Sequence, residues 1–149
     1  MLLVGSATGI GLWLPVIVDA LGVAVVPIDL AASLTGLAVM VLGVGLRLWA
    51  AVTLGKYYTT TLMMTEGQKV VTTGPYAWVR HPGYLGEVLL WTGFGLVSSN
   101  LIALVCLPLM FVVVLLYRIS SEERMLVKEL GDGYVQYQRR TRKLIPFVY

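Results

Sequence analysis

The 149-residue sequence contains few of the residues that build metal centres, disulfides and charged surfaces. Cys106 is its only cysteine, which excludes an internal disulfide, and His81 is its only histidine, which excludes a zinc site made of three histidines. Only 13% of the residues are charged, about half of what a soluble domain carries. The net charge of +3 gives no support for nucleic-acid binding. We therefore expect neither a metal site nor a nucleic-acid partner.

Apolar residues make up 58% of the chain, and its mean hydropathy is +0.83. These residues fall in long blocks, which is typical of membrane-spanning helices. The sequence therefore predicts an all-α integral membrane protein with about four transmembrane helices, forming a single domain over residues 1–149. The four apolar blocks lie within Leu2–Val26, at about Leu30–Leu54, at Tyr84–Val97 and at Leu101–Tyr117.

The lysines and arginines are unevenly distributed. Apart from Arg47, they lie between residues 55 and 83 and after residue 117, whereas the connections 19–29 and 98–100 contain none. Cytoplasmic loops of membrane proteins are rich in these residues. We therefore expect a multi-pass protein with both termini and the 55–83 loop in the cytoplasm. Loop and tail then share one membrane face, where the C-terminal half can form a cofactor pocket.

The polar segment after the fourth apolar block predicts two further helices. Ser120 or Ser121 is expected to cap the first, and Gly131 and Gly133 are expected to end it. The second is expected to cover Tyr134–Arg142. One face of it carries Tyr134, Tyr137 and Thr141.

The stretch Gly5–Gly11 has the glycine spacing of a dinucleotide-binding turn. That turn works only between a strand and a helix of a parallel sheet. Here the glycines lie inside an apolar block, so we interpret them as small residues for close helix packing.

Residues 74–86, Gly-Pro-Tyr-Ala-Trp-Val-Arg-His-Pro-Gly-Tyr-Leu-Gly, concentrate aromatic and basic side chains at the entrance to the third apolar block. An interfacial belt of tryptophan, tyrosine and arginine is one interpretation, and a ligand site is the other. Glu87 is an acid inside an apolar run, which favours a functional site, although pairing with Arg47 would also explain it.

Arg118 and Glu122 are four residues apart and share one helix face, as either a surface ion pair or part of a site. Together with residues 74–87 they offer aromatic rings, a guanidinium and a carboxylate. S-adenosylmethionine carries a sulfonium, an amino-acid head and an adenine, which such groups can bind. Methyl transfer to a carboxylate needs no general base, so positioning and desolvation suffice.

Three stretches of the sequence resemble the isoprenylcysteine carboxyl methyltransferase family, to which phospholipid methyltransferases are related. They are residues 66–76, residues 80–86 and residues 122–131, the last followed by Tyr134, Tyr137 and Ile145-Pro146. The resemblance covers roughly residues 36–147. It implies a membrane fold with an S-adenosylmethionine site at the cytoplasmic face, built from about residues 66–146.

The resemblance also implies roles for individual residues. Arg118 would orient the carboxylate of a lipophilic or prenylated acceptor that enters between spans in contact with membrane lipids. The cofactor would contact Gln68, Lys69, Val70, Val71, Tyr76, His81, Pro82, Gly83, Tyr84 and Glu122. Gly83 replaces a serine that is frequent in the family, and Gln68 replaces a histidine.

Three alternatives stay open. A phospholipid amine or a thiol could be the acceptor, and an amine would need a base such as Glu87 or His81. Membrane sterol reductases, which use NADPH, share a similar Arg-His stretch. A non-catalytic membrane adaptor would use the aromatic and basic cluster only as an interfacial belt.

Overall fold

The computed structural model describes residues 2–27, 29–58 and 69–145, and the side chains of these residues from residue 9 onward. Its elements are α1 (Leu2–Ala20), α2 (Leu30–Leu54), η1 (Gly55–Tyr57), η2 (Gly74–Ala77), α3 (Pro82–Val97), α4 (Leu101–Leu130) and α5 (Asp132–Arg140). In these described ranges the only β-type pairings are two isolated bridges. The chain is therefore all-helical, as expected.

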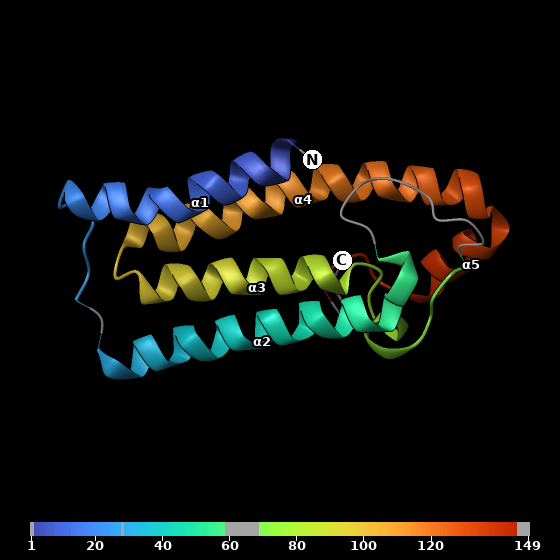
Figure 1. Ribbon diagram of the computed structural model, residues 1–149, viewed down its shortest axis with the longest axis horizontal. Coiled ribbons are helices and arrows are strands. Elements are labelled where there is room, and N and C mark those ends of the chain that lie inside the picture. The colour runs from blue at the N-terminus through green and yellow to red at the C-terminus, as the bar shows by residue number, and fades with distance from the viewer. Residues whose placement is uncertain (1, 28, 59–68, 146–149) are drawn as a thin grey trace.

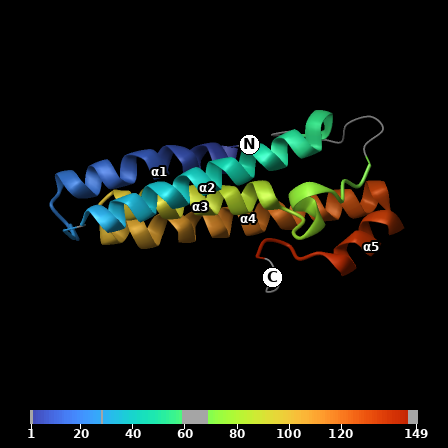
Figure 2. The ribbon, with the colours of Figure 1, turned by 90° about the horizontal axis from the view of Figure 1, so that it is seen from below.

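The four longer helices run side by side, and α5 folds back at one end, where α4 extends beyond α3 (Figures 1 and 2). Helix α3 packs against both α2 and α4, and α1 packs against α4. Two of the described helical segments have the length and hydropathy of a membrane span, Leu30–Tyr57 and Leu101–Leu130. The expectation of four spans stays a prediction for α1 and α3.

The termini of the helices follow from local chemistry. The Asp29 carboxylate accepts a hydrogen bond from the Ala32 amide at 2.8 Å and caps α2, and Asn100 caps α4 in the same way. Pro82 occupies the first turn of α3, where its missing amide hydrogen costs nothing. Gly131 ends α4 with φ at +57°, a conformation that favours glycine.

The polar end of α4 differs from our expectation. No new helix begins at Ser120 or Ser121, because α4 continues without a break to Leu130. The two serine hydroxyls donate to the carbonyls of Leu116 and Tyr117, four residues earlier. The last helix also begins earlier than predicted, at Asp132, so Gly133 lies inside α5 instead of ending its predecessor.

The seam between α2 and α3 is lined by glycines at seven-residue spacing on both helices. A Cβ atom on Gly93 would lie 2.5 Å from the Gly36 carbonyl oxygen, and one on Gly86 would lie 2.6 Å from that of Gly43. Real Cβ atoms essentially never approach so closely. The two backbones therefore pack directly against each other, which the sequence did not lead us to expect.

The core lies on the other side of α3. Trp91 stacks on Phe111 of α4, with ring centroids 4.6 Å apart and an interplanar angle of 12°. Ala103, Leu107 and Leu115 are buried around this pair. By contrast, apolar side chains on the outer face of α2 are open, up to 79% exposed at Val52. Such a surface suits lipid, in keeping with a membrane protein.

Candidate functional site

Two segments that are far apart in the sequence meet at the end of the bundle where α5 lies. The Arg80 amide donates to the Arg142 carbonyl at 2.8 Å, and the His81 amide donates to that of Lys143 at 3.1 Å. In return the Arg142 amide donates to the Trp78 carbonyl at 3.3 Å. Loop and tail therefore build one structure, as the sequence predicts.

Tyr84 links α3 to α4 through its hydroxyl group. The Arg118 Nε donates to the Tyr84 oxygen at 2.6 Å, and that hydroxyl donates to Glu122 Oε2 at 2.7 Å. The guanidinium carbon lies 5.7 Å from the centroid of the same ring. The phenol thus bridges the cation and the carboxylate that share one face of α4. A cation and an anion side by side can hold a ligand that itself carries both charges.

Glu123, the next residue on α4, points to a different partner set. Its Oε1 accepts from Arg80 Nε at 2.6 Å and lies 3.3 Å from His81 Nε2. The Arg80 guanidinium also donates to the carbonyl of Gln138 at 3.0 Å and to that of Thr141. This buried network ties α3, α4 and the tail together. Our sequence analysis did not place Glu123 in the site, although its neighbour Glu122 was a candidate.

Tyr76 is buried on η2, between α2 and α5. Its hydroxyl donates to the Ala50 carbonyl at 3.4 Å, and its own carbonyl accepts from the Tyr137 hydroxyl at 2.7 Å. Burial, reinforced by the nearby Glu122 carboxylate, raises the pKa of Tyr76 above its ordinary value. Tyr76 is therefore a neutral phenol at any physiological pH.

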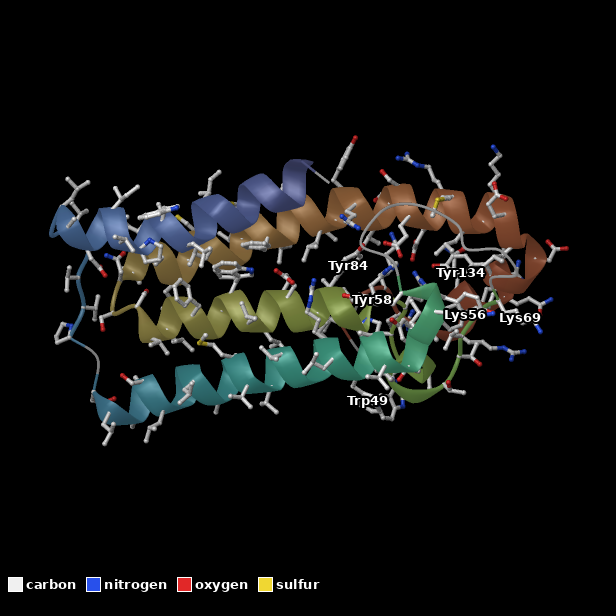
Figure 3. All side chains as sticks on the ribbon, in the orientation of Figure 1. Trp49, Lys56, Tyr58, Lys69, Tyr84 and Tyr134 are labelled. Carbon is white, nitrogen blue, oxygen red and sulfur yellow. The ribbon has the colours of Figure 1, made fainter. Side chains whose placement is uncertain are left out.

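The remaining sequence candidates around residues 69–83 lie at the same end. Lys69 is exposed and Val70 and Val71 are half-buried, and Figure 3 shows Lys69 at the end of the bundle where α5 lies. Pro82 is fully buried, whereas a Cβ on Gly83 would meet only the Ala50 Cβ at 3.9 Å. There is thus room at position 83 for the serine frequent in the family. Gln68 lies outside the described residues.

Glu87 lies one turn further along α3, facing α2. Its carboxylate pairs with Arg47 and accepts from Trp91 Nε1 at 3.0 Å. Both oxygens therefore have partners, and the ion pair bridges α2 and α3. This is the pairing with Arg47 that the sequence offers as the alternative explanation for an acid inside an apolar run.

The described residues contain no group of three or more His, Cys, Asp or Glu side chains that could hold a metal ion. The charged groups here pair with one another instead.

The buried face of α5 offers a test of how the tail is held. Tyr134, Tyr137 and Thr141, which the sequence predicts to share one face, are all buried, and burial raises the pKa of Tyr137 to about 12. Tyr137→Phe should destabilise the protein by about 1–2 kcal/mol, because the Tyr76 carbonyl loses its donor in a buried place. Thermal unfolding in detergent checks this, with exposed Gln136→Ala as control. Equal midpoints for the two variants would contradict it.

Comparison with known proteins gives a consistent answer. Residues 35–128, more than half of the chain, match the model of the isoprenylcysteine carboxyl methyltransferase (ICMT) family. Protein-S-isoprenylcysteine O-methyltransferase of Schizosaccharomyces pombe is 30% identical over 109 residues, which cover 64% of this chain and 46% of the relative. Protein-S-isoprenylcysteine O-methyltransferase B of Arabidopsis thaliana is 32% identical over 115 residues, 76% of this chain and 58% of the relative.

The fold agrees with the sequence match. A solved structure of the eukaryotic intramembrane Ras methyltransferase ICMT superposes with a TM-score of 0.75 at 28% identity, covering 99% of this chain and 52% of that one. The chain thus spans about half the length of the relatives it matches. Because the family model and the fold both cover most of the sequence, the chain belongs to the isoprenylcysteine carboxyl methyltransferase family.

Proposed function

We propose that this protein is an S-adenosylmethionine-dependent methyltransferase that esterifies the carboxylate of a lipophilic, prenylcysteine-like acceptor. Family membership supports the reaction class. The observation that carries the proposal is the Arg118–Tyr84–Glu122 cluster, which places a cation and a carboxylate 2.6 and 2.7 Å from one phenol oxygen. Trp78, 61% exposed at the same end of the bundle, suits a position at a membrane boundary.

The chain's own residues fit an amino-acid head and an aromatic base. The Glu122 carboxylate can pair with an ammonium, and the rings of Tyr84 and His81, stacked 5.6 Å apart, can face a sulfonium or a purine. S-adenosylmethionine supplies an electrophilic methyl on sulfur, so attack by a carboxylate oxygen gives a neutral ester and a neutral thioether. We assign the cofactor contacts to residues 68–71, Tyr76, residues 81–84 and Glu122.

Arg118 has the separate task of orienting the acceptor. A guanidinium holds a carboxylate in a fixed plane, which aligns the attacking oxygen with the methyl carbon. No residue has to remove a proton, since a carboxylate is already ionised. Glu87 then holds α2 against α3 through Arg47. It would act as a base only for an amine acceptor.

We further propose that four helices, α1 to α4, cross the membrane with the site at the cytoplasmic face. In support, exposed lysines and arginines gather at the α5 end of the described chain, at Lys56, Lys69, Arg124, Lys128, Arg139, Arg140 and Arg142. An exposed cysteine engineered at Ala77 should react with impermeant thiol reagents only from the cytoplasmic side. A Cys106→Ala background removes the one native thiol.

The decisive experiment is transfer of a labelled methyl group by the purified protein in nanodiscs. We expect S-adenosylmethionine to label a prenylcysteine analogue as a base-labile ester, with a rate that is flat above the acceptor's carboxyl pKa. A rate that rises with pH and a stable product from phospholipid amines would show an amine acceptor instead. Binding of NADPH without binding of S-adenosylmethionine would refute the proposal.

The cofactor contact of Glu122 is testable by calorimetry. Glu122→Gln should weaken S-adenosylmethionine binding about tenfold, because a charged hydrogen bond to the ammonium becomes a neutral one. Glu129→Gln is the matched control, because Glu129 lies on the same helix and is exposed. Unchanged affinity in Glu122→Gln would count against the assignment.

A further inference from the structure

We infer that Glu123 is a positioning residue for the site: it fixes the His81 ring as the Nε2–H tautomer and leaves Nδ1 as a hydrogen-bond acceptor. The proposed mechanism gives the Glu123 carboxylate no role. It lies beside the cofactor candidates without being one of them. The inference about the ring stands on geometry alone, and its meaning for the cofactor rests on the proposed function.

The geometry around the ring leaves His81 little freedom. Its side chain is 4% exposed, and Nε2 lies 3.3 Å from Glu123 Oε1. A carboxylate oxygen can only accept, so this contact is a hydrogen bond when Nε2 carries the proton. On its face the ring stacks on Tyr84, with an interplanar angle of 16°. The backbone amide of His81 donates to the Lys143 carbonyl oxygen at 3.1 Å.

Arg80 decides the charge of this network. Its Nε lies 2.6 Å from Glu123 Oε1, whereas His81 Nε2 lies 3.3 Å from the same oxygen. The guanidinium therefore balances the carboxylate, and the buried pair is neutral without a proton on Nδ1. With the proton on Nε2, the ring donates to the same carboxylate oxygen that Arg80 holds.

Neighbouring residues on α4 thus hold neighbouring parts of the site. Successive side chains on a helix diverge by about 100°. Glu123 accordingly holds His81, whereas Glu122 accepts from Tyr84, one turn further along α3. With Nε2 committed to Glu123, the opposite nitrogen, Nδ1, is the ring's remaining polar atom. An acceptor nitrogen suits an ammonium or an exocyclic amine, and a protonated ring would repel a sulfonium.

Because His81 is the only histidine, ¹⁵N-histidine labelling of the whole protein reports on this ring alone. In nanodiscs, at a pH where the ring is neutral, we expect a single tautomer with the proton on Nε2. A ring that carries its proton on Nδ1, or that averages between both forms, would overturn the inference. The wild-type spectrum decides this by itself, whatever the stability of any variant.

Glu123→Gln adds a second readout. A glutamine amide can either accept from the ring or donate to it, so we expect both tautomers in the variant and about tenfold weaker S-adenosylmethionine binding. Glu129→Gln, exposed on the same helix, should leave the spectrum and the affinity unchanged. A Glu123→Gln spectrum identical to the wild type would refute the positioning role.

The two proposals can fail separately. A wild-type protein with the Nε2–H tautomer that binds no S-adenosylmethionine would refute the proposed function and leave the role of Glu123 intact. A protein that binds S-adenosylmethionine and transfers methyl groups, but has an Nδ1–H ring, would support the proposed function and refute the role of Glu123.

Discussion

Arg118→Ala should lower methyl transfer by at least about 100-fold while S-adenosylmethionine still binds within about threefold of the wild-type affinity. The guanidinium is proposed to hold the acceptor carboxylate, so its loss removes alignment of the attacking oxygen. The proposed cofactor contacts at Glu122 and His81 remain. Turnover with a prenylcysteine analogue and calorimetry with S-adenosylmethionine measure the two effects separately.

Two variants serve as controls for that result. Arg124→Ala removes an exposed arginine from the same helix and should keep wild-type turnover. Arg118→Lys keeps the charge but loses the planar fork, so we expect only partial recovery over alanine. Wild-type rates in Arg118→Ala, or equal losses of turnover and cofactor affinity, would contradict the assignment to the acceptor.

Gly93→Ala should lower the thermal midpoint by about 2–12 °C, since overpacking typically costs about 1–3 kcal/mol. The new methyl would lie 2.5 Å from the Gly36 carbonyl and 2.7 Å from the Met40 backbone nitrogen. Neither backbone group can move without separating α2 from α3. Unfolding in detergent, followed by circular dichroism, measures the shift.

Gly45→Ala is the matched control on α2, because a Cβ there meets nothing within 4 Å. Alanine favours a helix over glycine by about 1 kcal/mol, so this variant should be unchanged or slightly more stable. If both substitutions left the midpoint unchanged, the close contact of the two helices would be disproved.

The hydropathy pattern predicted the bundle well where polar residues bound an apolar block. The predicted second block, at about Leu30–Leu54, has the bounds of α2, where Asp29 precedes the helix and Gly55 follows it. The fourth apolar block does end at Tyr117, but the helix boundary predicted at Ser120 or Ser121 is wrong, because α4 continues to Leu130. The change from apolar to polar residues marks where α4 leaves the apolar region. The helix itself continues to Leu130, because the polar residues that follow also favour a helix.

The candidate site was only partly predictable. Single-residue chemistry and the family resemblance pointed to His81, Tyr84, Arg118 and Glu122, which the structure brings to the α5 end of the bundle. The place of Glu123 depends on which way α3 and the tail approach α4, and no spacing in the sequence encodes that. The roles of all these residues stay predictions.

The glycine seam escaped notice for a similar reason. Its glycines are seven residues apart on each helix, and only the pairing of α2 with α3 shows that the two sets face each other. Small residues in apolar helices are common, so their positions alone do not identify a partner.

The unbroken course of α4 has a mechanical consequence. One rigid rod carries Phe111 in the core and Glu122 at the site, roughly 16 Å apart along its axis at 1.5 Å per residue. A tilt of about 5° at the core would swing Glu122 by roughly 1.4 Å, and displacements of about 1 Å can cost on the order of 100-fold in rate. Long apolar helices change their tilt to match the surrounding bilayer. Lipids with longer or shorter chains would thus change the rate of the proposed methyl transfer without contacting the reacting groups.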